Sequence, residues 1–352
     1  ELVKWVGMPI QDVCRMSYSK LVESYIMKRS KEFNEIYPNK PDQGAIAVRR
    51  MHTYQGASVI EPEPGLFENI AVIDFKGFWP SILVAHNISP STLTDNKEDS
   101  YVSPDIIDEN GEKINYYFTY KQDGFIPLIV KDLILRRNRV KEILKNEEES
   151  PTLKARYYAL KTISNATYGY FGFFGARWYC RECSASITAW GREYIKKLIE
   201  KAREENFKVI YSDTDSIFLA LEKKSKDEVL IFIEKLNREL PSLMELDLEN
   251  FYPRGIFVMK RTEKEGAKKK YALISEEGNI IVKGFETIRR DWSYIAKEVQ
   301  KNVIDLILKE NSPKKAYEYV TEVINEIKLK NIPKEKMIIQ TQLKKKIENY
   351  DL

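Results

Sequence analysis

Histidine and cysteine are scarce in this sequence, with two histidines and three cysteines in 352 residues. So few histidines give little support to a histidine-based nucleophilic mechanism. A structural zinc site is also disfavoured, because Cys180-Arg-Glu-Cys183 supplies two ligands and only the two histidines remain to complete a set of four. An odd and low cysteine count excludes a disulfide framework. Cys180 and Cys183 therefore form either a local disulfide or a pair of reduced, packed thiols.

Long apolar runs are absent too. No stretch approaches the roughly 18 residues that a membrane span needs, and no signal peptide is visible at the start. With 43% hydrophobic and 31% charged residues, the composition is typical of a globular protein with no membrane partner, and we expect a cytoplasmic location. The length allows two or three domains. The chain opens on Glu1 rather than methionine, so we interpret it as a fragment or a short natural form.

The sequence also lacks a large net charge, since the formal value is only +4. A small net value does not exclude a nucleic-acid partner, because the acidic residues of a metal site can offset basic surfaces elsewhere. Three local clusters are candidate phosphate contacts: Lys268-Lys269-Lys270, Arg289-Arg290 and Lys344-Lys345-Lys346. The alternative interpretation of each cluster is a solvated surface.

The pattern of apolar residues predicts a protein of mixed helices and sheet. The run at 69–75 is typical of a buried strand that ends at Asp74, and 207–221 is typical of a hairpin with an acidic tip. Residues 95–124 are polar and are expected to be irregular, with a turn at 108–111. Helices are predicted at 12–36, 127–148, 152–168, 183–204 and, with breaks at Pro313 and Pro333, from 291 onward; further strands are predicted at 251–259, 271–275 and 279–283. This order indicates an α+β core with helical appendages.

Three aspartates lie at the ends of predicted strands. Asp74 ends the buried strand, and Asp213 and Asp215 occupy the tip of the hairpin. Desolvating a carboxylate is costly unless a cation or a donor compensates it. Carboxylate and phosphate oxygens together suit Mg²⁺, and two metal ions about 4 Å apart can activate one oxygen and stabilise a leaving one. The alternative is turn chemistry, because aspartate and serine favour turns.

The two predicted helices before and after the break at 147–151 are expected to form an antiparallel pair. Each has a polar face that suits a nucleoside triphosphate, with cations for phosphates and an aromatic ring for a base pair. The alternative is two amphipathic surface helices. The residues on these faces are Arg137, Lys141 and Lys145 on the first helix, and Lys161, Asn165 and Tyr168 on the second.

In combination, these motifs resemble those of the family B DNA polymerases, in particular the archaeal ones. Asp74-Phe-Lys-Gly-Phe-Trp-Pro-Ser81 is similar to the first palm motif, Lys161-Thr-Ile-Ser-Asn-Ala-Thr-Tyr-Gly169 to the fingers motif, and Tyr211-Ser-Asp-Thr-Asp-Ser216 to the second palm motif. Three shorter matches are Tyr54-Gln-Gly56-Ala in the linker, and Thr188-Ala-Trp-Gly191-Arg192 and Lys269-Lys270-Tyr271 in the DNA-contacting motifs. Several motifs in the same order are highly specific, and they extend from about residue 5 to residue 350.

The resemblance implies a role for each matched residue. Asp74 and Asp215 would be the main ligands of two Mg²⁺ ions, with Mn²⁺ as an alternative, and Asp213 would be a third catalytic residue beside them. Glu249 and Asp247 match further acidic positions of the family less closely. Nucleotide binding is implied for Arg137, Lys141, Lys161, Asn165, Tyr168, Phe78 and Trp79, and DNA binding for Tyr54, Gly56, Thr188, Gly191, Arg192, Lys269 and Tyr271.

The resemblance also implies a right-hand architecture, with an antiparallel-sheet palm, two-helix fingers inserted into the palm and a helical thumb. The expected division is 1–50 as N-terminal linker and palm-associated helices, 51–124 and 171–284 as palm, 125–170 as fingers and 285–352 as a truncated thumb. The implied activity is template-directed DNA synthesis from dNTPs on primer–template DNA, at the nucleoid. A sliding clamp and the polymerase segments missing from this chain are candidate partners.

The sequence departs from the family pattern in two places. Gly77-Phe78-Trp79 stands where the family has Ser-Leu-Tyr, whose tyrosine is the usual steric gate against ribose. We expect the larger Trp79 to retain that exclusion and Gly77 to loosen the backbone. No Asp-x-Glu motif precedes the linker, so we expect no proofreading by this chain. In archaeal relatives the pair equivalent to Cys180 and Cys183 can be a local disulfide.

Two other functions are compatible with parts of the pattern. A non-catalytic, polymerase-like DNA-binding subunit is suggested by the changes at 77–79. A two-metal nuclease would share the carboxylates but would not need the face of Lys161, Asn165 and Tyr168. Primer extension with Mg²⁺ distinguishes a polymerase from the non-catalytic subunit. Dependence on all four nucleotides distinguishes it from the nuclease.

Overall fold

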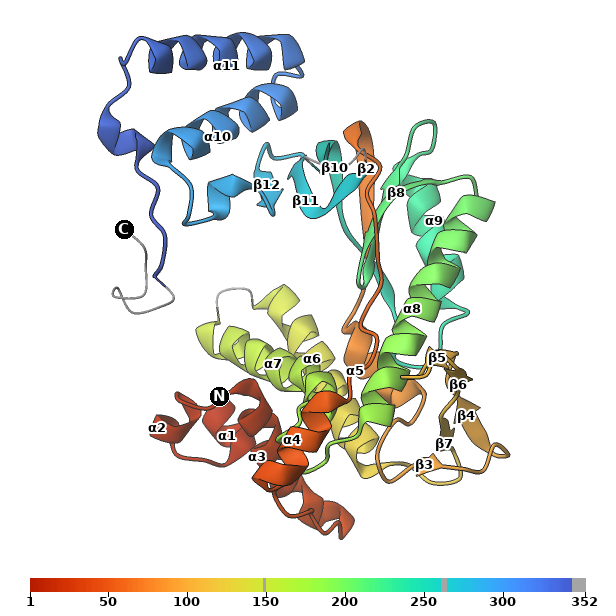
Figure 1. Ribbon diagram of the computed structural model, residues 1–352. Helices are drawn as coiled ribbons and strands as arrows, with labels where there is room; N and C mark the ends of the chain where they lie inside the picture. The colour runs from red at the N-terminus through yellow and green to blue at the C-terminus, as the bar shows by residue number, and fades with distance from the viewer. Residues whose placement is uncertain (148–149, 261–264, 344–352) are drawn as a thin grey trace. The chain divides into compact units, whose positions relative to one another are not determined.

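The computed structural model (Figure 1) describes residues 1–147, 150–260 and 265–343. The chain divides into two compact units. Unit 1 comprises Glu1–Ser58, Phe75–Glu200 and Ile233–Asp247, and unit 2 comprises Val59–Asp74, Lys201–Phe232 and the described residues of Leu248–Leu352. Among the described residues, no helix combines the length and the apolar character that crossing a membrane requires. The basic cluster at 344–346 lies outside the described residues.

A seven-stranded sheet forms the centre of unit 2, with its strands in the order β1-β8-β9-β2-β10-β11-β12. The strands are β1 (Val59–Ile60), β2 (Gly65–Phe75), β8 (Lys208–Asp213), β9 (Ser216–Ala220), β10 (Leu246–Met259), β11 (Gly266–Ile274) and β12 (Ile280–Lys283). The predicted strands at 69–75, 207–221, 251–259, 271–275 and 279–283 are therefore confirmed, although β2, β10 and β11 begin earlier than expected.

Strand β2 is buried on both faces, which explains its continuous apolar run. Ile70 and Val72 pack into an aromatic cluster with Tyr211, Phe218 and Phe257 on one face. The alternate residues of the run, at 71 and 73, are also completely buried. Successive side chains of a strand point to opposite faces, so apolar material covers both sides of the sheet here. The strand is thereby fixed in register up to its last buried residues, next to Asp74.

A two-residue loop joins β8 to β9, as the sequence predicts. Asp213 pairs with Ser216 across the hairpin, and the strands are antiparallel. Thr214 begins the loop with φ 64, in the left-handed region that tight hairpins use. This loop places Asp213 at the end of one strand and Asp215 directly before the next.

The pairing of β10 with β11 is irregular near Lys269. Phe257 pairs with Tyr271 but Met259 pairs with Gly266, so β11 carries extra residues between these pairs and bulges outward. Lys269 adopts φ 60 within the bulge. Gly284 (φ 67) packs against it so closely that an added Cβ would lie 2.0 Å from the Lys269 carbonyl oxygen. Only glycine fits this position, and it fixes the shape of the bulge.

Helices complete unit 2, as predicted from residue 291 onward. They are α10 (Tyr294–Leu308), α11 (Pro313–Lys328) and the short η2 (Glu286–Ile288) and η3 (Lys334–Met337). Ser293 caps α10 and Ser312 caps α11, where Pro313 takes the first helical position. A second core forms where the α10 residues Ile304 and Leu308 meet Ala272 of the sheet.

Unit 1 is mainly helical. Its helices are α1 (Leu2–Val6), α2 (Ile10–Val13), α3 (Tyr18–Ser30), η1 (Lys31–Phe33), α4 (Gln43–Met51), α5 (Phe78–Ala85), α6 (Phe125–Asn146), α7 (Pro151–Phe171) and most of α8 (Arg181–Glu204). The helices α6 and α7 pack against each other, and α7 also packs against α3. Ser150 caps α7 with Pro151 in its first turn. The predicted helices at 127–148, 152–168 and 183–204 are confirmed.

Three predictions of secondary structure were wrong. The helix expected at 12–36 is interrupted after Val13, and α3 begins only at Tyr18, after the cap residue Ser17, whose hydroxyl accepts from the Lys20 N–H. Residues 95–124 contain short strands, because polar segments pair with one another there: β4 (Ser100–Val102), β5 (Ile106–Ile107), β6 (Lys113–Ile114) and β7 (Tyr117–Thr119), with β3 (Leu93–Thr94) before them. The helices α4, α5 and α9 (Lys226–Asn237) were not predicted. The turn at 108–111 is confirmed.

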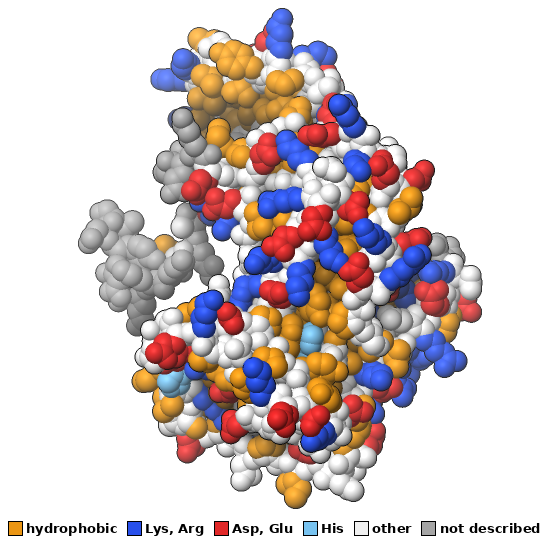
Figure 2. Space-filling model, turned by 90° about the vertical axis from the view of Figure 1, so that its right-hand side faces the viewer, with side chains coloured by type: hydrophobic (Ala, Val, Ile, Leu, Met, Phe, Trp, Pro, Cys, Tyr) orange, Lys and Arg blue, Asp and Glu red, His pale blue; other side chains and the backbone are white. Residues whose placement is uncertain are grey.

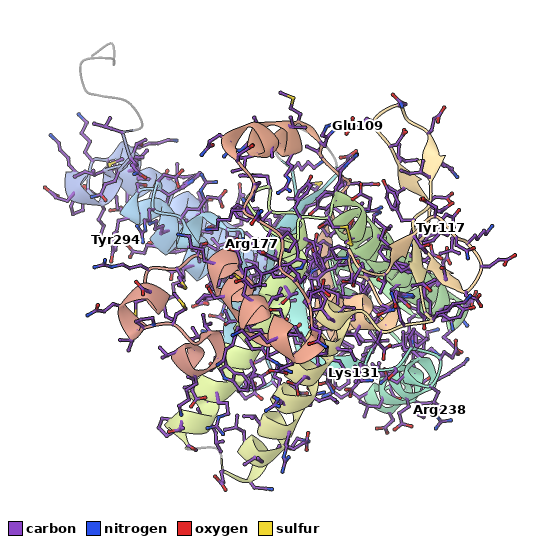
Figure 3. The ribbon with its side chains drawn as sticks, turned by 90° about the horizontal axis from the view of Figure 1, so that it is seen from below. Glu109, Tyr117, Lys131, Arg177, Arg238 and Tyr294 are labelled. Atoms are coloured by element: carbon purple, nitrogen blue, oxygen red, sulfur yellow. A yellow bond between two sulfur atoms is a disulfide. The ribbon has the colours of Figure 1, made fainter. Side chains whose placement is uncertain are left out.

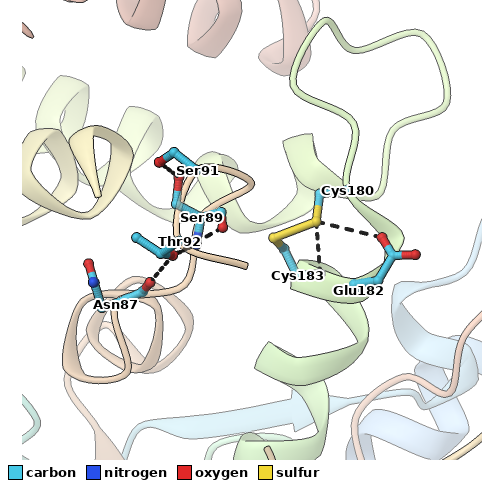
Figure 4. Close-up of a disulfide and its surroundings, with 7 residues drawn as sticks. All are labelled: Asn87, Ser89, Ser91, Thr92, Cys180, Glu182 and Cys183. Carbon is cyan, nitrogen blue, oxygen red and sulfur yellow. Dashed lines mark hydrogen bonds between the residues drawn. A yellow bond between two sulfur atoms is a disulfide. The ribbon is translucent and has the colours of Figure 1, made fainter. Parts of the chain in front are cut away.

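The CxxC pair is a disulfide at the start of α8 (Figure 4). Cys180 and Cys183 are both buried, with Cα atoms 5.3 Å apart. Sγ of Cys180 also accepts the backbone N–H of Cys183 at 3.1 Å. This decides between the two states that the sequence left open. Cys14 is exposed and free.

Candidate active site

The three aspartates of the predicted metal site lie at neighbouring strand ends in unit 2. Asp74 of β2 and Asp213 of β8 are each directly opposite Ser216 of β9, the strand between them. Residues directly opposite one another share a face of the sheet, so Asp74 and Asp213 point to the same side. Two strand spacings separate them, or about 10 Å between Cα atoms. Asp215 precedes Ser216 in the loop between them.

The surroundings of Asp215 perturb its carboxyl group. Burial raises its pKa, and the negative charges of Asp213 and Glu249 raise it further, while Lys269 opposes the shift. Its backbone N–H donates to the Asp213 carbonyl at 2.7 Å, which holds the loop closed. Sequence reasoning gave Glu249 only a weak match, and the structure brings its charge within range of Asp215. The group therefore has an excess of negative charge at a half-buried position.

Lys269 balances one of these acids. Its Nζ lies 2.6 Å from the Asp213 carboxylate. Its backbone N–H donates to the Tyr211 hydroxyl at 3.0 Å, and burial raises the pKa of that hydroxyl to about 12. Tyr271 stacks on Phe257 at 5.6 Å, inside the aromatic cluster. That Lys269 and Tyr271 bind DNA stays a prediction; in the structure Lys269 pairs with Asp213, and Tyr271 packs in the aromatic cluster.

These carboxylates suit a Mg²⁺ ion that a substrate also binds better than they suit a metal ion bound by the protein alone. Within the described residues, no group of three or more histidine, cysteine, aspartate and glutamate side chains is arranged to hold a metal ion. Mg²⁺, however, is usually bound by one or two carboxylates together with substrate phosphates. Asp74 and Asp215 would supply such oxygens, and a cation would relieve the repulsion around Asp215.

A second group of predicted residues lies in unit 1, around the start of α5. Gly77 precedes this helix in the left-handed conformation with φ 59, and an added Cβ would lie 3.4 Å from a guanidinium nitrogen of Arg137. Arg137 is only 7% exposed, and its Nε has no hydrogen-bond partner in the described part of the chain. The free backbone N–H groups of a helix start and a guanidinium together attract an anion. Glycine suits this left-handed position, so the presence of Gly77 can be explained without a looser backbone.

The other cations that were predicted to bind nucleotide differ in their surroundings. Lys141 lies 4.0 Å from Asp247, which also pairs with Lys76 at 3.1 Å. Lys161 and Asn165 are exposed on α7. Asp247, a weaker match to the acidic positions that the family carries near its metals, is the counterion of Lys76 and Lys141 in unit 1. Lys76 was not predicted as a site residue. Its position two residues after Asp74 was the one indication in the sequence that it lies near the site.

Trp79 has a close aromatic environment. Its ring stacks on Tyr168 with centroids 4.8 Å apart and an interplanar angle of 20°, and it lies 5.0 Å from the ring of Phe78. An added Cβ at Gly191 would come within 2.7 Å of the indole. Gly191, predicted to contact DNA, therefore also makes room for Trp79. The substitution of the usual tyrosine by tryptophan is accommodated by existing neighbours.

The predicted linker motif is held by two other predicted DNA contacts. The hydroxyl of Thr188 donates to the Gln55 carbonyl at 2.7 Å. Arg192 donates to the carbonyls of Gln55 and Gly56 at 3.0 and 2.8 Å. The Tyr54 hydroxyl interacts with Tyr168, whose pKa is raised mainly by burial. These contacts hold the linker motif in place. The spacing of the residues in the sequence could not reveal them.

The chain is matched over residues 8–352 by the model of DNA polymerase family B. The chain belongs to this family. It is 41% identical over 360 residues to a DNA polymerase of Pyrococcus glycovorans, covering 99% of this chain and 44% of the relative. It is 40% identical over 362 residues to a DNA polymerase of Thermococcus gorgonarius, with the same coverage.

A solved family B structure is also similar. The family B DNA polymerase from the hyperthermophilic archaeon Pyrobaculum calidifontis matches with a TM-score of 0.75 and 33% identity, over 100% of this chain and 44% of that one. The family B chain described here thus spans less than half the length of the relatives it matches. The resemblance inferred from the motifs is confirmed.

Proposed function

We propose that this chain carries out template-directed DNA synthesis, adding deoxynucleotides from dNTPs to a primer 3′ end by two-metal nucleotidyl transfer. The observation that carries the proposal is the acidic group of unit 2, where a half-buried Asp215 faces the charges of Asp213 and Glu249. Such a group is costly unless a bound cation uses it. The names of the relatives indicate which reaction the cation serves.

In this mechanism, Asp74 and Asp215 would hold two Mg²⁺ ions, with Mn²⁺ as an alternative. When bound, the ions would favour ionisation of the primer 3′-hydroxyl and neutralise charge on the departing pyrophosphate. Asp213 would keep Lys269 beside the site, where its ammonium group can meet a primer phosphate. Asp215 would remain ionised under these conditions, because a nearby cation lowers a carboxylate pKa.

The residues of unit 1 would bind the incoming nucleotide. Arg137 and the start of α5 at Phe78 offer donors to phosphate oxygens, and Lys141 and Lys161 add positive charge. The base pair would pack against Asn165 and the stacked rings of Tyr168 and Trp79. Selection would then depend on base-pair shape in a closed pocket.

Primer extension with Mg²⁺ and four dNTPs tests the proposal. The Asp215→Ala variant should lose at least about a hundredfold in rate, the loss that follows from weakening a metal ligand. Asp95→Ala, an exposed aspartate outside the site, is the matched control and should extend normally. Unchanged extension by Asp215→Ala would refute the assignment. DNA binding without extension in every variant would favour the non-catalytic subunit, and nuclease activity independent of dNTPs would favour the nuclease.

The expectation of no proofreading concerns these 352 residues alone. Incubating the purified chain with a single-stranded, end-labelled primer and Mg²⁺, without dNTPs, tests it. We expect the primer to keep its length. Stepwise shortening from the 3′ end would contradict this part of the proposal.

A further inference from the structure

Each of the three consecutive lysines of β11 has an acidic partner that the other two do not share. The three carboxylates belong to separate segments of unit 2: the residues before β2, the end of β8 and the start of η2. The pairs are Lys268 with Glu61 at 3.5 Å, Lys269 with Asp213 at 2.6 Å, and Lys270 with Glu286 at 2.6 Å. Glu61 also lies 3.5 Å from Lys260. Three identical side chains are therefore distributed over three different acids.

Strand pairing does not determine this distribution. The ladder between β10 and β11 has one pair at Gly266 and the next at Tyr271, so all three lysines lie in the bulge between them. Bulged residues have no partner residue across the ladder. A bulge can therefore shift by one residue without breaking the pair on either side, and such a shift turns each side chain to the other face. It would exchange one lysine for the next beside Asp213.

Backbone contacts hold the bulge in place but do not distinguish its lysines. The N–H of Lys269 donates to the Tyr211 hydroxyl at 3.0 Å, and the Lys269 carbonyl packs against Gly284. Every lysine offers the same N–H and C=O groups, so either neighbour could make these contacts. The side-chain pairs are what identify Lys269 as the residue beside the acidic site.

The three pairs differ in burial. The Glu286 side chain is 11% exposed and that of Lys270 25%, whereas the Lys269 side chain is 63% exposed. The pair of Lys268 and Glu61 is also open to solvent. Exposed ion pairs contribute little to stability, whereas removing one partner of a buried pair is strongly destabilising. The pair of Lys270 and Glu286 is therefore the one that constrains the bulge most.

Helix α10 holds Glu286 in position. Gln300 of this helix, whose first residue Tyr294 is labelled in Figure 3, donates through Nε2 to the Glu286 carboxylate at 2.6 Å. The Gln300 side-chain oxygen in turn accepts the N–H of Thr287 at 2.9 Å. Burial raises the pKa of Glu286, but the hydrogen bonds from Gln300 and Lys270 outweigh it and lower the pKa to about 2. Glu286 is thus a fixed carboxylate that stays ionised at neutral pH.

We propose that Glu286 is a positioning residue, which retains Lys270 and thereby leaves Lys269 as the lysine that lies beside Asp213. Without Glu286, the Lys270 ammonium would lose its counterion, and its Cα is only about 3.8 Å from that of Lys269. Lys270 would then compete for Asp213. The consequence for the reaction rests on the proposed function, in which Lys269 meets a primer phosphate, whereas the pairing itself does not.

Carbodiimide cross-linking of the whole chain tests the pairing without any reaction on DNA. The reagent condenses a carboxylate with an ammonium group that touches it, so that an amide bond forms and the reagent takes up the water to become a urea. Tandem mass spectrometry then identifies the two residues. In the wild type we expect Asp213 to be linked to Lys269 at least about tenfold more often than to Lys270. Equal links from Asp213 to both lysines would overturn the proposal.

Glu286→Gln should raise the share of Asp213 links that reach Lys270 at least about fivefold, because this ammonium has lost its counterion. Adding Lys270→Gln removes the competitor, and the yield of the link between Asp213 and Lys269 should then return to the wild-type value. Glu276→Gln is the matched control, because it removes a carboxylate that pairs with another lysine in the turn after β11, and it should leave these links unchanged.

Links that Glu286→Gln does not alter would refute the proposal. A loss of the link between Asp213 and Lys269 that persists in the double variant would refute it as well, since competition by Lys270 would not be its cause. Circular dichroism checks that each variant is folded, and the wild-type links decide the question if Glu286→Gln does not fold.

Primer extension by the same proteins tests the consequence for the reaction. Glu286→Gln should lower kcat/KM for primer–template about fivefold, and the double variant should recover most of this loss. Full extension by Glu286→Gln, despite shifted links, would overturn the role of Glu286 in the reaction. Absence of extension by the wild type would instead refute the proposed function, and the links would still decide the pairing.

Discussion

Asp215 is the residue at which stability and proposed function conflict most directly. Its carboxyl group is largely removed from water and faces two other acids, and its pKa is therefore raised. A carboxyl whose pKa is raised on folding costs stability once the pH rises through that pKa, and costs nothing below the ordinary value of 3.8. At neutral pH the ionised side chain should destabilise the metal-free protein.

Asp215→Asn should therefore stabilise the metal-free protein while abolishing primer extension. We expect a gain of about 1 kcal/mol at pH 8, the scale of one relieved buried group, and a shrinking gain as the pH falls towards 4. Urea unfolding in EDTA at several pH values measures it, with Asp95→Asn as the control. Lower stability of Asp215→Asn at pH 8 would contradict the argument. Mg²⁺ should raise the melting temperature of the wild type more than that of the variant.

Trp79 is the second residue with a specific expectation. It stacks on Tyr168 and closes against Gly191, so it fills the space beside the proposed sugar position. Trp79→Ala should raise ribonucleotide incorporation relative to deoxynucleotide incorporation by roughly tenfold to a hundredfold. Trp79→Tyr should change this ratio little, because a ring remains. Single-nucleotide extension with dATP and ATP measures it, and equal ratios in all three proteins would show that Trp79 does not select the sugar.

At the scale of elements, the bulge in β11 depends on one glycine. Gly284 and Gly278 both have positive φ, at 67 and 81, but only Gly284 has a neighbour where its Cβ would be. Gly284→Ala should cost at least about 2 kcal/mol, from strain and from displacing the Lys269 carbonyl. Gly278→Ala should cost about 1 kcal/mol, from its φ alone. Chemical denaturation compares the two, and equal losses would mean that the contact with Lys269 is unimportant.

Elements specified by local pattern could be predicted from the sequence, and those specified by distant contacts could not. The hairpin of β8 and β9 has its apolar runs and its acidic tip within one short segment, and the caps of α7 and α11 contain proline at the expected place. The strands between 95 and 124 depend on partners outside each segment, so a polar composition concealed them. The helix predicted at 12–36 failed because a serine cap at Ser17 restarts it.

The candidate site shows the same division. Asp74, Asp213 and Asp215 were identified as a set because the strand ends and the family motifs agree. The internal contacts of Thr188 and Arg192 with the Gln55 carbonyl could not be predicted, since they join segments more than 130 residues apart. The position of Asp247 beside Lys76 and Lys141 likewise appears only in three dimensions. A motif match identifies a residue but does not identify the residues that it contacts in the fold.

At the scale of the whole molecule, the basic cluster at 268–270 is neutralised internally. Lys268 lies 3.5 Å from Glu61, Lys269 pairs with Asp213, and Lys270 lies 2.6 Å from Glu286. Basic and acidic side chains are interspersed on the face in Figure 2. DNA phosphates would therefore compete with these internal acids for the lysines. Binding should be sensitive to salt and to the loss of individual lysines.

Primer–template binding should weaken about a thousandfold between 50 and 200 mM salt, if six or more phosphates are contacted. Lys269→Ala should reduce the slope of log affinity against log salt by roughly one. Lys314→Ala, on α11 and outside the proposed contacts, is the control and should keep the slope. Fluorescence anisotropy with a labelled duplex measures both. A slope near zero would indicate that binding does not rely on phosphate contacts.

The pairing of β2 with β9 has a consequence for how the molecule is made. Ile70 pairs with Ala220, and most of unit 1 lies in the chain between them. The β8 and β9 hairpin can close locally within microseconds, whereas β2 must find it across a long loop whose closure costs entropy. Asp74 thus joins Asp215 only after the intervening segment has been synthesised and has left the ribosome. Until that late step, a nascent chain would lack the proposed metal site and could not carry out the proposed transfer reaction.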